Sequence, residues 1–371
     1  MYMKTYTFVL PVIVIITILS VFVGAAPSHA AYHFADFIAH SPLHIFSVTG
    51  KVPIGITPAE IKKFYNLPAT GGVGTIAIIG AYNDASIEKD LADFNTAFGL
   101  PTCTIKNGCL TKHLMSTKMS DNSAWDLETA LDVEWAHAIA PKAKILLVEA
   151  TTASGKNLLA AVDYAGKRKD VTAISMSWGG AEFPEETTLD SHFVSVSKAQ
   201  FFASSGDSGM GASWPAASPK VVAVGGTSIA LTSQRNLLKE IAWSGSGGGI
   251  SVYEKEPGFQ SVYNIPKANG MRAIPDVAYN ADPASGFPII HSGVWRTAGG
   301  TSAGAPQWAA IATLGKGANN WSFYTDKSST KNGQYFRDVT SGSNGTCGFY
   351  CNAQARYDYV TGLGTPQTTT F

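Results

Sequence analysis

Charge is scarce in this 371-residue sequence, and neither sign dominates. Charged residues make up 15% of the chain, with 27 Lys and Arg against 27 Asp and Glu. The sequence contains no run of Lys or Arg of the length that a basic footprint on a nucleic acid needs, so we expect no nucleic-acid partner. A low density of carboxylates also limits the charge imbalance in acid, which suits a protein that works at low pH.

One long apolar run stands near the start of the chain. It covers residues 8–23, and small residues suited to a signal peptidase follow at residues 28–30. An uncleaved membrane anchor is the alternative, but polar residues and a proline interrupt a run already short for spanning a bilayer. We therefore predict that residues 1–30 are a secretory signal peptide. The protein is then expected to be secreted, with no stable membrane insertion after cleavage.

Cysteine is limited to four residues, which stand in two local pairs, Cys103 with Cys109 and Cys347 with Cys351. A secreted location permits disulfides, so both local pairs are predicted to form. Closing the first loop would stabilise the fold by about 2 kcal/mol on the chain-entropy model. A metal at the second pair is the alternative, but no further cysteine or histidine neighbours it, so zinc is not expected there.

Beyond the signal peptide, short apolar segments alternate with helical patterns. Strands are predicted at residues 74–82, 143–150, 171–177, 200–204 and 220–224, and helices at residues 86–98, 123–140, 157–169 and 187–198. This alternation predicts an α/β fold, a parallel sheet flanked by helices on both faces. No internal repeat or low-complexity linker interrupts residues 56–371, so we predict a short N-terminal segment, residues 31–55, followed by one domain.

Ser302 is the candidate nucleophile. It lies in the glycine-rich turn at residues 299–306, just before an apolar run at residues 307–314. Glycines let a substrate approach closely, and a helix start supplies free N–H groups near an oxyanion. The alternative is a serine that merely caps a buried helix.

No histidine stands in the His-Gly setting expected of a histidine base, because none of the eight is followed by glycine. Two carboxyl groups are better placed. Glu128 and Asp132 lie one turn apart on the predicted helix at residues 123–140, whose start, Ser123 with Asp126, resembles a capping box. Two carboxylates at this spacing repel unless they share a proton, which favours a chemical role over a solvated acidic face.

Two loops follow predicted strands directly and are expected to meet at the carboxyl rim of the sheet. They are Ser177-Trp178-Gly179-Gly180 and the Ser-Gly-Asp-Ser-Gly motif at residues 205–209. Taken alone, the first is an ordinary strand end with a packed tryptophan, and the second is a turn.

Three motifs in this order resemble those of the sedolisins, serine-carboxyl peptidases that keep a subtilisin-like fold and replace the histidine by glutamate. The motifs are Glu128-x-x-x-Asp132, the sequence at residues 205–209 and Gly-Thr-Ser at residues 300–302. The resemblance extends from about residue 56 to residue 364. Members of the family usually carry a long prodomain, for which only residues 31 to about 55 are available here.

The resemblance implies a role for each of these residues. Ser302 attacks the peptide carbonyl, Glu128 takes its proton, and Asp132 holds Glu128 in place. A protonated Asp207 donates to the oxyanion. Ser177, Trp178 and Gly179 line the substrate, with Trp178 suggesting an apolar subsite wall. The backbone there pairs with the substrate as an added strand.

The resemblance also implies a calcium site near the C-terminus. Its ligands would be Asp338, Val339, Gln354, Arg356 and Asp358, which supply two carboxylates and backbone carbonyls. The family usually has Gly-x-Gly-x-Asp ending at the second aspartate, whereas this chain has Gln354 and Arg356 at the glycine positions. Two solvated loop aspartates are the alternative.

The expected function is a secreted, acid-acting endopeptidase with polypeptide substrates. A tripeptidyl exopeptidase of the same family and a non-catalytic binding module on the same fold are the alternatives. Possible glycosylation sites occur at Asn320 and Asn344. The sequence leaves the oligomeric state open.

Overall fold

The computed structural model describes residues 33–326 and 335–371, which belong to one compact unit. The predicted signal peptide lies outside the described residues. None of the helices within the described ranges combines the length and the apolar composition that a bilayer crossing needs.

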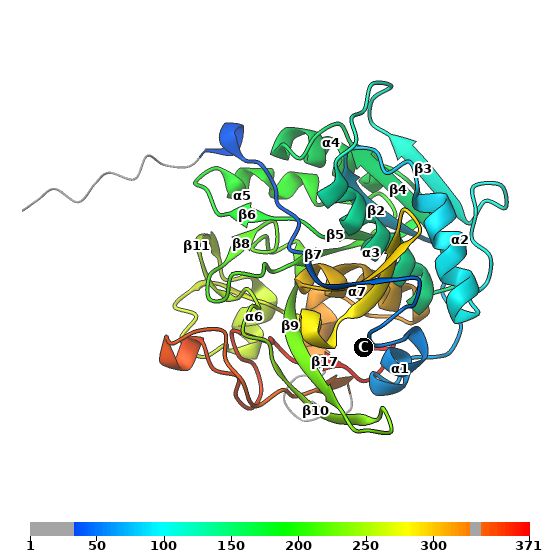
Figure 1. Ribbon diagram of the computed structural model, residues 1–371. Helices are drawn as coiled ribbons and strands as arrows, with labels where there is room; N and C mark the ends of the chain where they lie inside the picture. The colour runs from blue at the N-terminus through cyan, green and yellow to red at the C-terminus, as the bar shows by residue number, and fades with distance from the viewer. Residues whose placement is uncertain (1–32, 327–334) are drawn as a thin grey trace, which may run out of the picture. The chain divides into compact units, whose positions relative to one another are not determined.

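The core of the fold is an eight-stranded sheet (Figure 1). Its strands lie in the order β10 (Leu237–Ala242), β9 (Val221–Leu231), β7 (Gln200–Ser204), β5 (Val171–Met176), β2 (Thr75–Ala81), β4 (Lys144–Ala150) and β3 (Leu110–Leu114), with β13 (Val277–Asn280) also on β9. All neighbours are parallel except β10 with β9. The predicted parallel sheet is confirmed, and each predicted strand is present, although β9 extends to Leu231.

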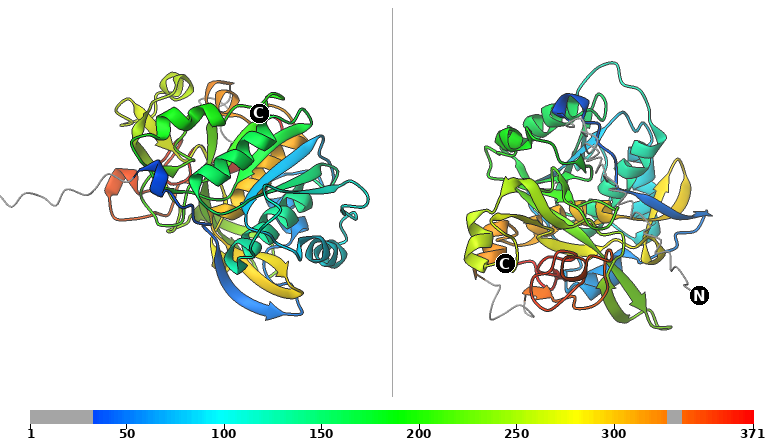
Figure 2. Two further views of the ribbon diagram at one scale, coloured as in Figure 1. Left: turned by 90° about the horizontal axis from the view of Figure 1, so that it is seen from above. Right: turned by 90° about the vertical axis from the view of Figure 1, so that its left-hand side faces the viewer.

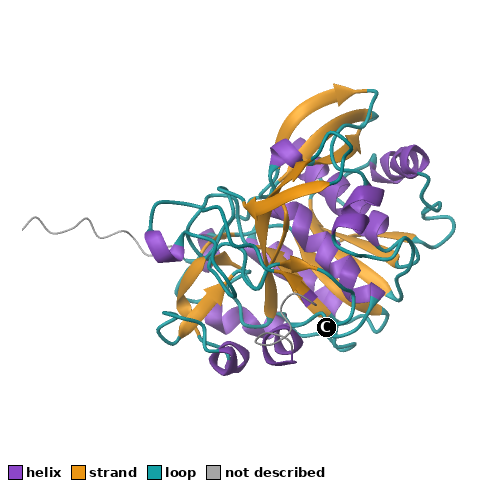
Figure 3. Ribbon diagram, turned by 90° about the horizontal axis from the view of Figure 1, so that it is seen from below, coloured by secondary structure: helices purple, strands orange, loops and turns teal. Residues whose placement is uncertain are grey.

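Both faces of the sheet are buried, which explains why its strands read as continuous apolar runs. On β2, Ile76 and Ile78 pack into one hydrophobic cluster and Ala77 and Ile79 into another. Helices α2 (Ile87–Phe98), α3 (Ser123–Ile139) and α7 (Gly304–Leu314) belong to the first side, and α4 (Gly155–Gly166) belongs to the second. Figure 3 shows helices, in purple, packed around the strands, in orange.

A second, antiparallel sheet carries the start of the described chain. Strand β1 (His44–Gly50) pairs with β15 (Val294–Gly299), which pairs in turn with β14 (Phe287–His291). The blue and yellow strands in Figure 2 show this sheet. Because β15 runs directly into the turn that holds Ser302, the N-terminal segment is tied to the region of the candidate nucleophile.

The remaining elements are short. They are α1 (Pro58–Phe64), β6 (Gly180–Ala181), α5 (Glu186–Leu189), β8 (Ser213–Trp214), β11 (Gly249–Lys255), α6 (Gly258–Tyr263), β12 (Met271–Ile274), β16 (Phe336–Arg337) and β17 (Thr365–Pro366).

The predicted helix at residues 187–198 is wrong. Only the four residues of α5 and one 3-10 turn at Asp190–His192 are helical there. Serine side chains compete for the backbone of the rest, since Ser195 Oγ accepts a hydrogen bond from the Ser197 backbone N–H at 3.3 Å. Lys198 has a φ of 63°, which ends any helix.

The predicted capping box of α3 is also wrong. The N-cap is Asn122, whose side-chain oxygen accepts hydrogen bonds from the backbone N–H groups of Ala124 and Trp125 at 3.1 and 3.3 Å. Asn is as good an N-cap as Ser, so the helix starts at Ser123 for a different reason from the one expected.

Both predicted disulfides are present, between Cys103 and Cys109 and between Cys347 and Cys351. The two glycosylation sequons are buried. The side-chain amide of Asn320 donates to the Val221 carbonyl oxygen, and that of Asn344 donates to the Ser246 carbonyl oxygen. Neither amide is accessible to a glycan in the folded chain.

Candidate active site

Ser302 lies in a 3-10 turn, Thr301–Ala303, that leads directly into α7. Its side chain is fully buried, and its Oγ donates a hydrogen bond to Oε2 of Glu128 at 3.0 Å. Gly300 precedes the turn with a φ of 122°, where only glycine is unstrained. A Cβ at Gly300 would also collide with the Pro42 carbonyl oxygen and with Oδ2 of Asp207. The glycine therefore gives two oxygens access to the turn that holds Ser302.

Glu128 and Asp132 lie one turn apart on α3 and are buried. The Asp132 side chain is hydrogen-bonded to Glu128, and Ser177 Oγ donates to Asp132 Oδ1 at 2.7 Å. Burial raises the pKa of both carboxyls, and the charge of Glu128 raises the pKa of Asp132 further. The hydrogen bonds from Ser41 and Ser302 favour the charged form of Glu128. Asp132 therefore holds a proton more readily than Glu128, and Oε2 of Glu128 is the carboxyl oxygen that accepts from Ser302.

Asp207 lies in the loop after β7, and its side chain is 6% exposed. Its Oδ1 accepts hydrogen bonds from the backbone N–H and the hydroxyl of Thr301 at 2.8 and 2.7 Å. Its Oδ2 faces Nε2 of His44 at 3.1 Å. Burial raises the pKa of Asp207, with the contacts to His44 and Thr301 opposing that rise, while Asp207 raises the pKa of His44. Oδ2 of Asp207 therefore points away from Thr301, toward His44 and Gly300.

The cleft beside these residues contains the chain's own residues 38–44, which we call the cleft segment. The backbone N–H of His40 donates to the Gly179 carbonyl oxygen at 2.9 Å, and the N–H of Gly179 donates back at 3.1 Å. The pairing is antiparallel. The Ser41 hydroxyl donates to Oε2 of Glu128, the same oxygen that accepts from Ser302. The cleft segment thus occupies the position of an added strand, which is how extended peptides bind to a sheet edge.

A cavity of about 500 Å³ adjoins the cleft segment. Its walls include the cleft segment itself, the strip at residues 179–181 and the loop at residues 204–213. Most of these wall residues are glycine, serine or alanine, so the cavity is lined mainly by small side chains.

The interpretation of Trp178 as a subsite wall stays a prediction, since Trp178 lies in a hydrophobic cluster that also contains Ala39 of the cleft segment. The side chain is fully buried, and its indole N–H donates to the Ile79 carbonyl oxygen at 3.1 Å. Ser177 points toward Asp132 and also donates to the Ser302 carbonyl oxygen at 3.3 Å. Of the three predicted substrate-lining residues, only Gly179 has its backbone paired with a strand in the cleft.

The structure also places two residues at the site that the sequence analysis did not assign to it, Ser41 and His44. Neither stands in a motif. His44 lies on β1, which pairs with β15, and Ser41 follows His40, which pairs with Gly179. Within residues 33–326 and 335–371, no histidine is hydrogen-bonded to Ser302 or Glu128. The carboxyl pair is therefore the only candidate base in the part of the chain that the structure describes.

The five predicted calcium ligands lie on two segments that touch. The Arg356 backbone N–H donates to Asp338 Oδ2 at 2.8 Å, and Asp338 Oδ1 is buried without a hydrogen-bond partner. The Asp358 carboxyl is fully buried, and both oxygens accept hydrogen bonds, from Gln354, Val360 and Thr361. Arg356 has a φ of 72°, in the region that favours glycine. Asp338 has an oxygen left for a cation, whereas Asp358 would have to exchange partners.

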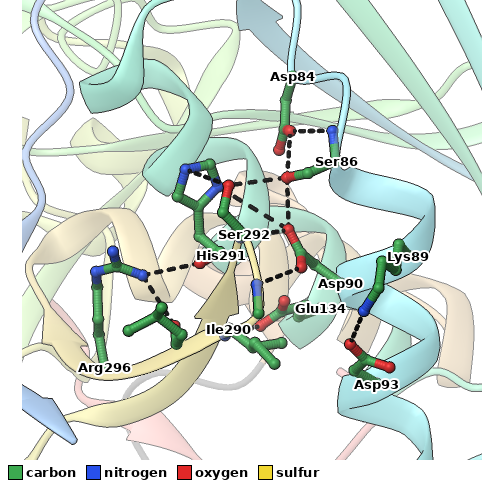
Figure 4. Close-up of polar contacts among 12 residues, drawn as sticks. Asp84, Ser86, Lys89, Asp90, Asp93, Glu134, Ile290, His291, Ser292 and Arg296 are labelled. Carbon is green, nitrogen blue, oxygen red and sulfur yellow. Dashed lines mark hydrogen bonds and ion pairs between the residues drawn. The ribbon is translucent and has the colours of Figure 1, made fainter. Parts of the chain in front are cut away.

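A second group of buried carboxyls lies away from Ser302, between α2, α3 and the β14–β15 turn (Figure 4). Asp90 accepts hydrogen bonds from the backbone N–H groups of Ser292 and Gly293 at 2.8 and 3.1 Å and from the Ser86 hydroxyl at 2.5 Å. Glu134 accepts from the Ile290 N–H at 3.2 Å. These bonds tie the antiparallel sheet to α2 and α3, so we assign this group a structural role.

A serine hydrogen-bonded to a buried carboxyl pair, at the carboxyl rim of a mostly parallel sheet, is the arrangement of the serine-carboxyl class. Residues 117–339 match the model of the subtilase family, which is more than half of the chain, so the chain belongs to that family. Its relatives narrow the assignment further.

Sedolisin from Pseudomonas sp. (strain 101) is 29% identical over 353 residues, which cover 84% of this chain and 59% of that protein. Kumamolisin from Bacillus sp. (strain MN-32) is 30% identical over 359 residues, which cover 85% of this chain and 62% of that protein. The chain therefore spans about three fifths of the length of these two relatives.

A solved structure of Pseudomonas sedolisin, a serine-carboxyl proteinase in complex with two molecules of pseudo-iodotyrostatin, matches with a TM-score of 0.74 at 28% identity. The match covers 85% of this chain and 96% of that chain. The predicted resemblance to the sedolisins and the predicted subtilisin-like fold are confirmed.

Proposed function

We propose that this protein is a serine-carboxyl peptidase that hydrolyses peptide bonds through an acyl-enzyme on Ser302. The observation that carries the proposal is the 3.0 Å hydrogen bond from Ser302 Oγ to Glu128, whose partner Asp132 is buried beside it. A nucleophile, a base within reach and a third group that orients the base are the parts that covalent catalysis needs.

In this mechanism Glu128 accepts the proton of Ser302 as the hydroxyl attacks the substrate carbonyl, and later returns it to the leaving amine. Asp132 keeps its own proton in the hydrogen bond to Glu128, and Ser177 fixes Asp132. Asp207 supports the developing oxyanion, because the carboxyl group, when protonated at Oδ2, can donate a hydrogen bond. Buried donors of this kind act without reorganisation by water.

We further propose that the substrates are extended polypeptides cut internally. Support comes from the cleft segment, which continues on both sides of Gly300: toward Phe34 in one direction and into β1 in the other. A cleft that holds a continuous chain on both sides of the nucleophile suits an endopeptidase. A tripeptidyl exopeptidase would instead need a group that binds a free amine close to the nucleophile on one side.

The test is to incubate the purified protein with an unstructured polypeptide at about pH 4 and pH 7.5. Products are identified by mass spectrometry, and the Ser302→Ala variant is the control. Internal fragments formed by the wild type alone support the endopeptidase. Tripeptides released in order from the amino end would support the exopeptidase, and equal products from both proteins would reject Ser302. A wild type that binds the polypeptide without cutting it would support the binding module.

We also propose that calcium binds between Asp338 and Asp358, with the backbone carbonyls of Val339, Gln354 and Arg356 completing the oxygen set. The unpartnered oxygen of Asp338, buried beside the Arg356 backbone, supports this.

We also propose that the protein is secreted. The two disulfides and the proposed calcium site are features that suit an extracellular protein. Fractionation of an expressing culture tests this location.

A further inference from the structure

We propose that Cys103, Cys109 and His137 form a zinc site, which opens when the disulfide between the two cysteines is reduced. The two sulfurs and a ring nitrogen of His137 lie within 4.8 Å of one another. No other group of three or more Cys, His, Asp or Glu side chains is so closely spaced within residues 33–326 and 335–371. The inference does not depend on the proposed peptidase function, because it uses none of the residues of the candidate active site.

The hydrogen bond of His137 determines which of its nitrogens is free. His137 lies in the last turn of α3 and is fully buried, with Nε2 at 2.9 Å from the Pro101 carbonyl oxygen. A carbonyl oxygen only accepts, so Nε2 carries the proton and Nδ1 carries the lone pair. Nδ1 is buried without a hydrogen-bond partner, which is uncommon for a buried polar atom. A histidine that binds a metal usually donates its other N–H to such a carbonyl or to a carboxylate, so His137 is prepared as a ligand.

His137 also has the protonation state that a metal needs. Burial lowers its pKa, the hydrogen bond to Pro101 opposes this, and the nearby charge of Lys62 lowers the pKa further. Lys62 itself is held away as a donor to the Ala69 carbonyl oxygen at 2.8 Å. Since only a neutral imidazole binds a metal ion, the lowered pKa favours binding.

The two cysteines differ in how firmly the fold holds them. Cys103 is fully buried in the hydrophobic core, whereas Cys109 is partly buried and packs against the same core. Cys109 ends an exposed turn at residues 105–108 and directly precedes β3. The turn can therefore readjust when the two sulfurs separate, while Cys103 and His137 keep their places.

The chemistry balances with a dithiol as the reductant. The dithiol gives two electrons and two protons to the Cys103–Cys109 bond and becomes a disulfide, which leaves two protein thiols. Zn²⁺ then releases both thiol protons to solvent and binds the two thiolates and Nδ1 of His137. The described residues offer no fourth ligand to this group, so water completes the tetrahedron. Thiolate and imidazole ligands select zinc over calcium, which takes oxygen ligands.

Every chain passes through this dithiol form, because a disulfide forms only after the chain has been made. In that form zinc links the loop before β3 to α3, a connection that the disulfide alone does not make. When a disulfide oxidant later takes two electrons from the thiolates, the Cys103–Cys109 bond forms and zinc leaves.

The test uses the full chain with Cys347→Ser and Cys351→Ser, so that one pair of thiols remains. The protein is reduced with a dithiol, freed from it under argon, and titrated with Co²⁺ and then with Zn²⁺. We expect one Co²⁺ per chain with thiolate-to-metal charge-transfer bands, displacement by Zn²⁺ but not by Ca²⁺, and no binding by the oxidised chain. Zn²⁺ should also raise the melting temperature of the reduced chain.

His137→Ala in the same background should weaken Zn²⁺ binding by about tenfold or more. His113→Ala, which removes a histidine stacked on Tyr164, is the matched control and should bind as the parent does. If His137→Ala does not fold, His137→Phe keeps a ring in the core and gives the same comparison.

Four results would overturn the inference. They are Co²⁺ bound without thiolate bands, Zn²⁺ bound equally by the oxidised chain, a folded His137 variant that binds Zn²⁺ as tightly as the parent, and a reduced chain that unfolds whether or not Zn²⁺ is present.

Discussion

At the residue scale, the account depends on which buried carboxyls hold protons. Glu128, Asp132, Asp207 and Ser302 were predicted from short motifs, and the structure brings the four together. Ser41 and His44 were not predicted, because nothing in the local sequence at residues 38–44 marks them. His44 meets the site through the pairing of β1 with β15, and Ser41 meets it through the pairing of His40 with Gly179, both contacts between segments far apart in the sequence. A sequence motif marks a functional residue only when the residues next to it in the chain also contribute to the site. A single functional residue without such neighbours is not marked by any motif.

Asp207 should set the alkaline limit of activity. It donates only when protonated, and its raised pKa keeps it protonated to a higher pH than an ordinary aspartate. Activity should therefore be high in acid and fall as the pH rises through the pKa of Asp207. Asp207→Asn donates at every pH, so it should keep some turnover and lose much of the alkaline fall. Asp207→Ala should lose about 10²-fold or more.

The measurement is kcat against pH for the three proteins. A wild-type optimum at about pH 8, where an ordinary aspartate is fully ionised, would remove Asp207 from the mechanism. The same conclusion would follow if the alanine variant matched wild type at the wild-type optimum.

At the scale of elements, the sequence predicted the strands of the central sheet, because burial on both faces makes their residues apolar. The central strands are apolar on both faces, so they read as uninterrupted runs with turn residues at each end. The segment at residues 187–198, where a helix was expected, has no such uninterrupted apolar run. Its serines bond to nearby backbone, and the buried Phe193 packs against Trp214 from a loop. Trp178, predicted as an apolar subsite wall, packs in the hydrophobic cluster that also contains Phe37 and Ala39 of the N-terminal segment.

Asp90 should stabilise the docking of the β14–β15 turn without affecting catalysis. Asp90→Ala leaves the buried N–H groups of Ser292 and Gly293 without their acceptor, which should lower the free energy of unfolding by about 1–3 kcal/mol. Asp93→Ala on the same helix removes only an exposed pair with Lys89, so it should change stability by about 0.5 kcal/mol or less. Denaturant unfolding of both variants measures the difference.

Turnover per folded molecule is the control for this pair. Asp90→Ala with normal stability but reduced turnover would move Asp90 from a structural to a catalytic role, contrary to the assignment made here.

At the scale of the whole molecule, buried carboxyls outside the catalytic set tie stability to pH. Burial raises the pKa of Glu186 to about 9, of Glu254 to about 8 and of Glu149 to about 7. In the unfolded chain a glutamate titrates near 4.3. Between the two values the folded protein holds protons that the unfolded chain releases, so stability falls as the pH rises. The contribution is complete below the unfolded pKa and is lost as the pH passes the folded value.

We therefore expect the denaturant midpoint to be higher at pH 5 than at pH 8. Glu186→Gln, which cannot ionise, should reduce this difference and should leave the midpoint at pH 5 nearly unchanged. Glu88→Gln on α2, where the residue is only partly buried and its amide oxygen can still accept from the Ile105 N–H, should behave like wild type. A midpoint that rises from pH 5 to pH 8 would contradict the role assigned to the buried carboxyls.

Calcium should add to stability through the C-terminal loop. A ligand that binds only the folded chain stabilises it by about 2.7 kcal/mol at a hundredfold excess over its Kd. A chelator should therefore lower the melting temperature of wild type but not that of Asp338→Ala, whose unpartnered oxygen is the ligand that the fold leaves free. An unchanged wild-type melt in chelator would reject the site.

The most direct test of the central claim, that Glu128 is the base for Ser302, is the turnover of Glu128→Gln on an unstructured polypeptide at about pH 4. Glutamine keeps the size of the side chain and an oxygen for the Ser302 hydroxyl, but it cannot accept the proton. We expect kcat to fall by about 10²–10⁴-fold, with secretion and melting temperature close to wild type. A folded Glu128→Gln protein that turns over as fast as wild type would contradict the account.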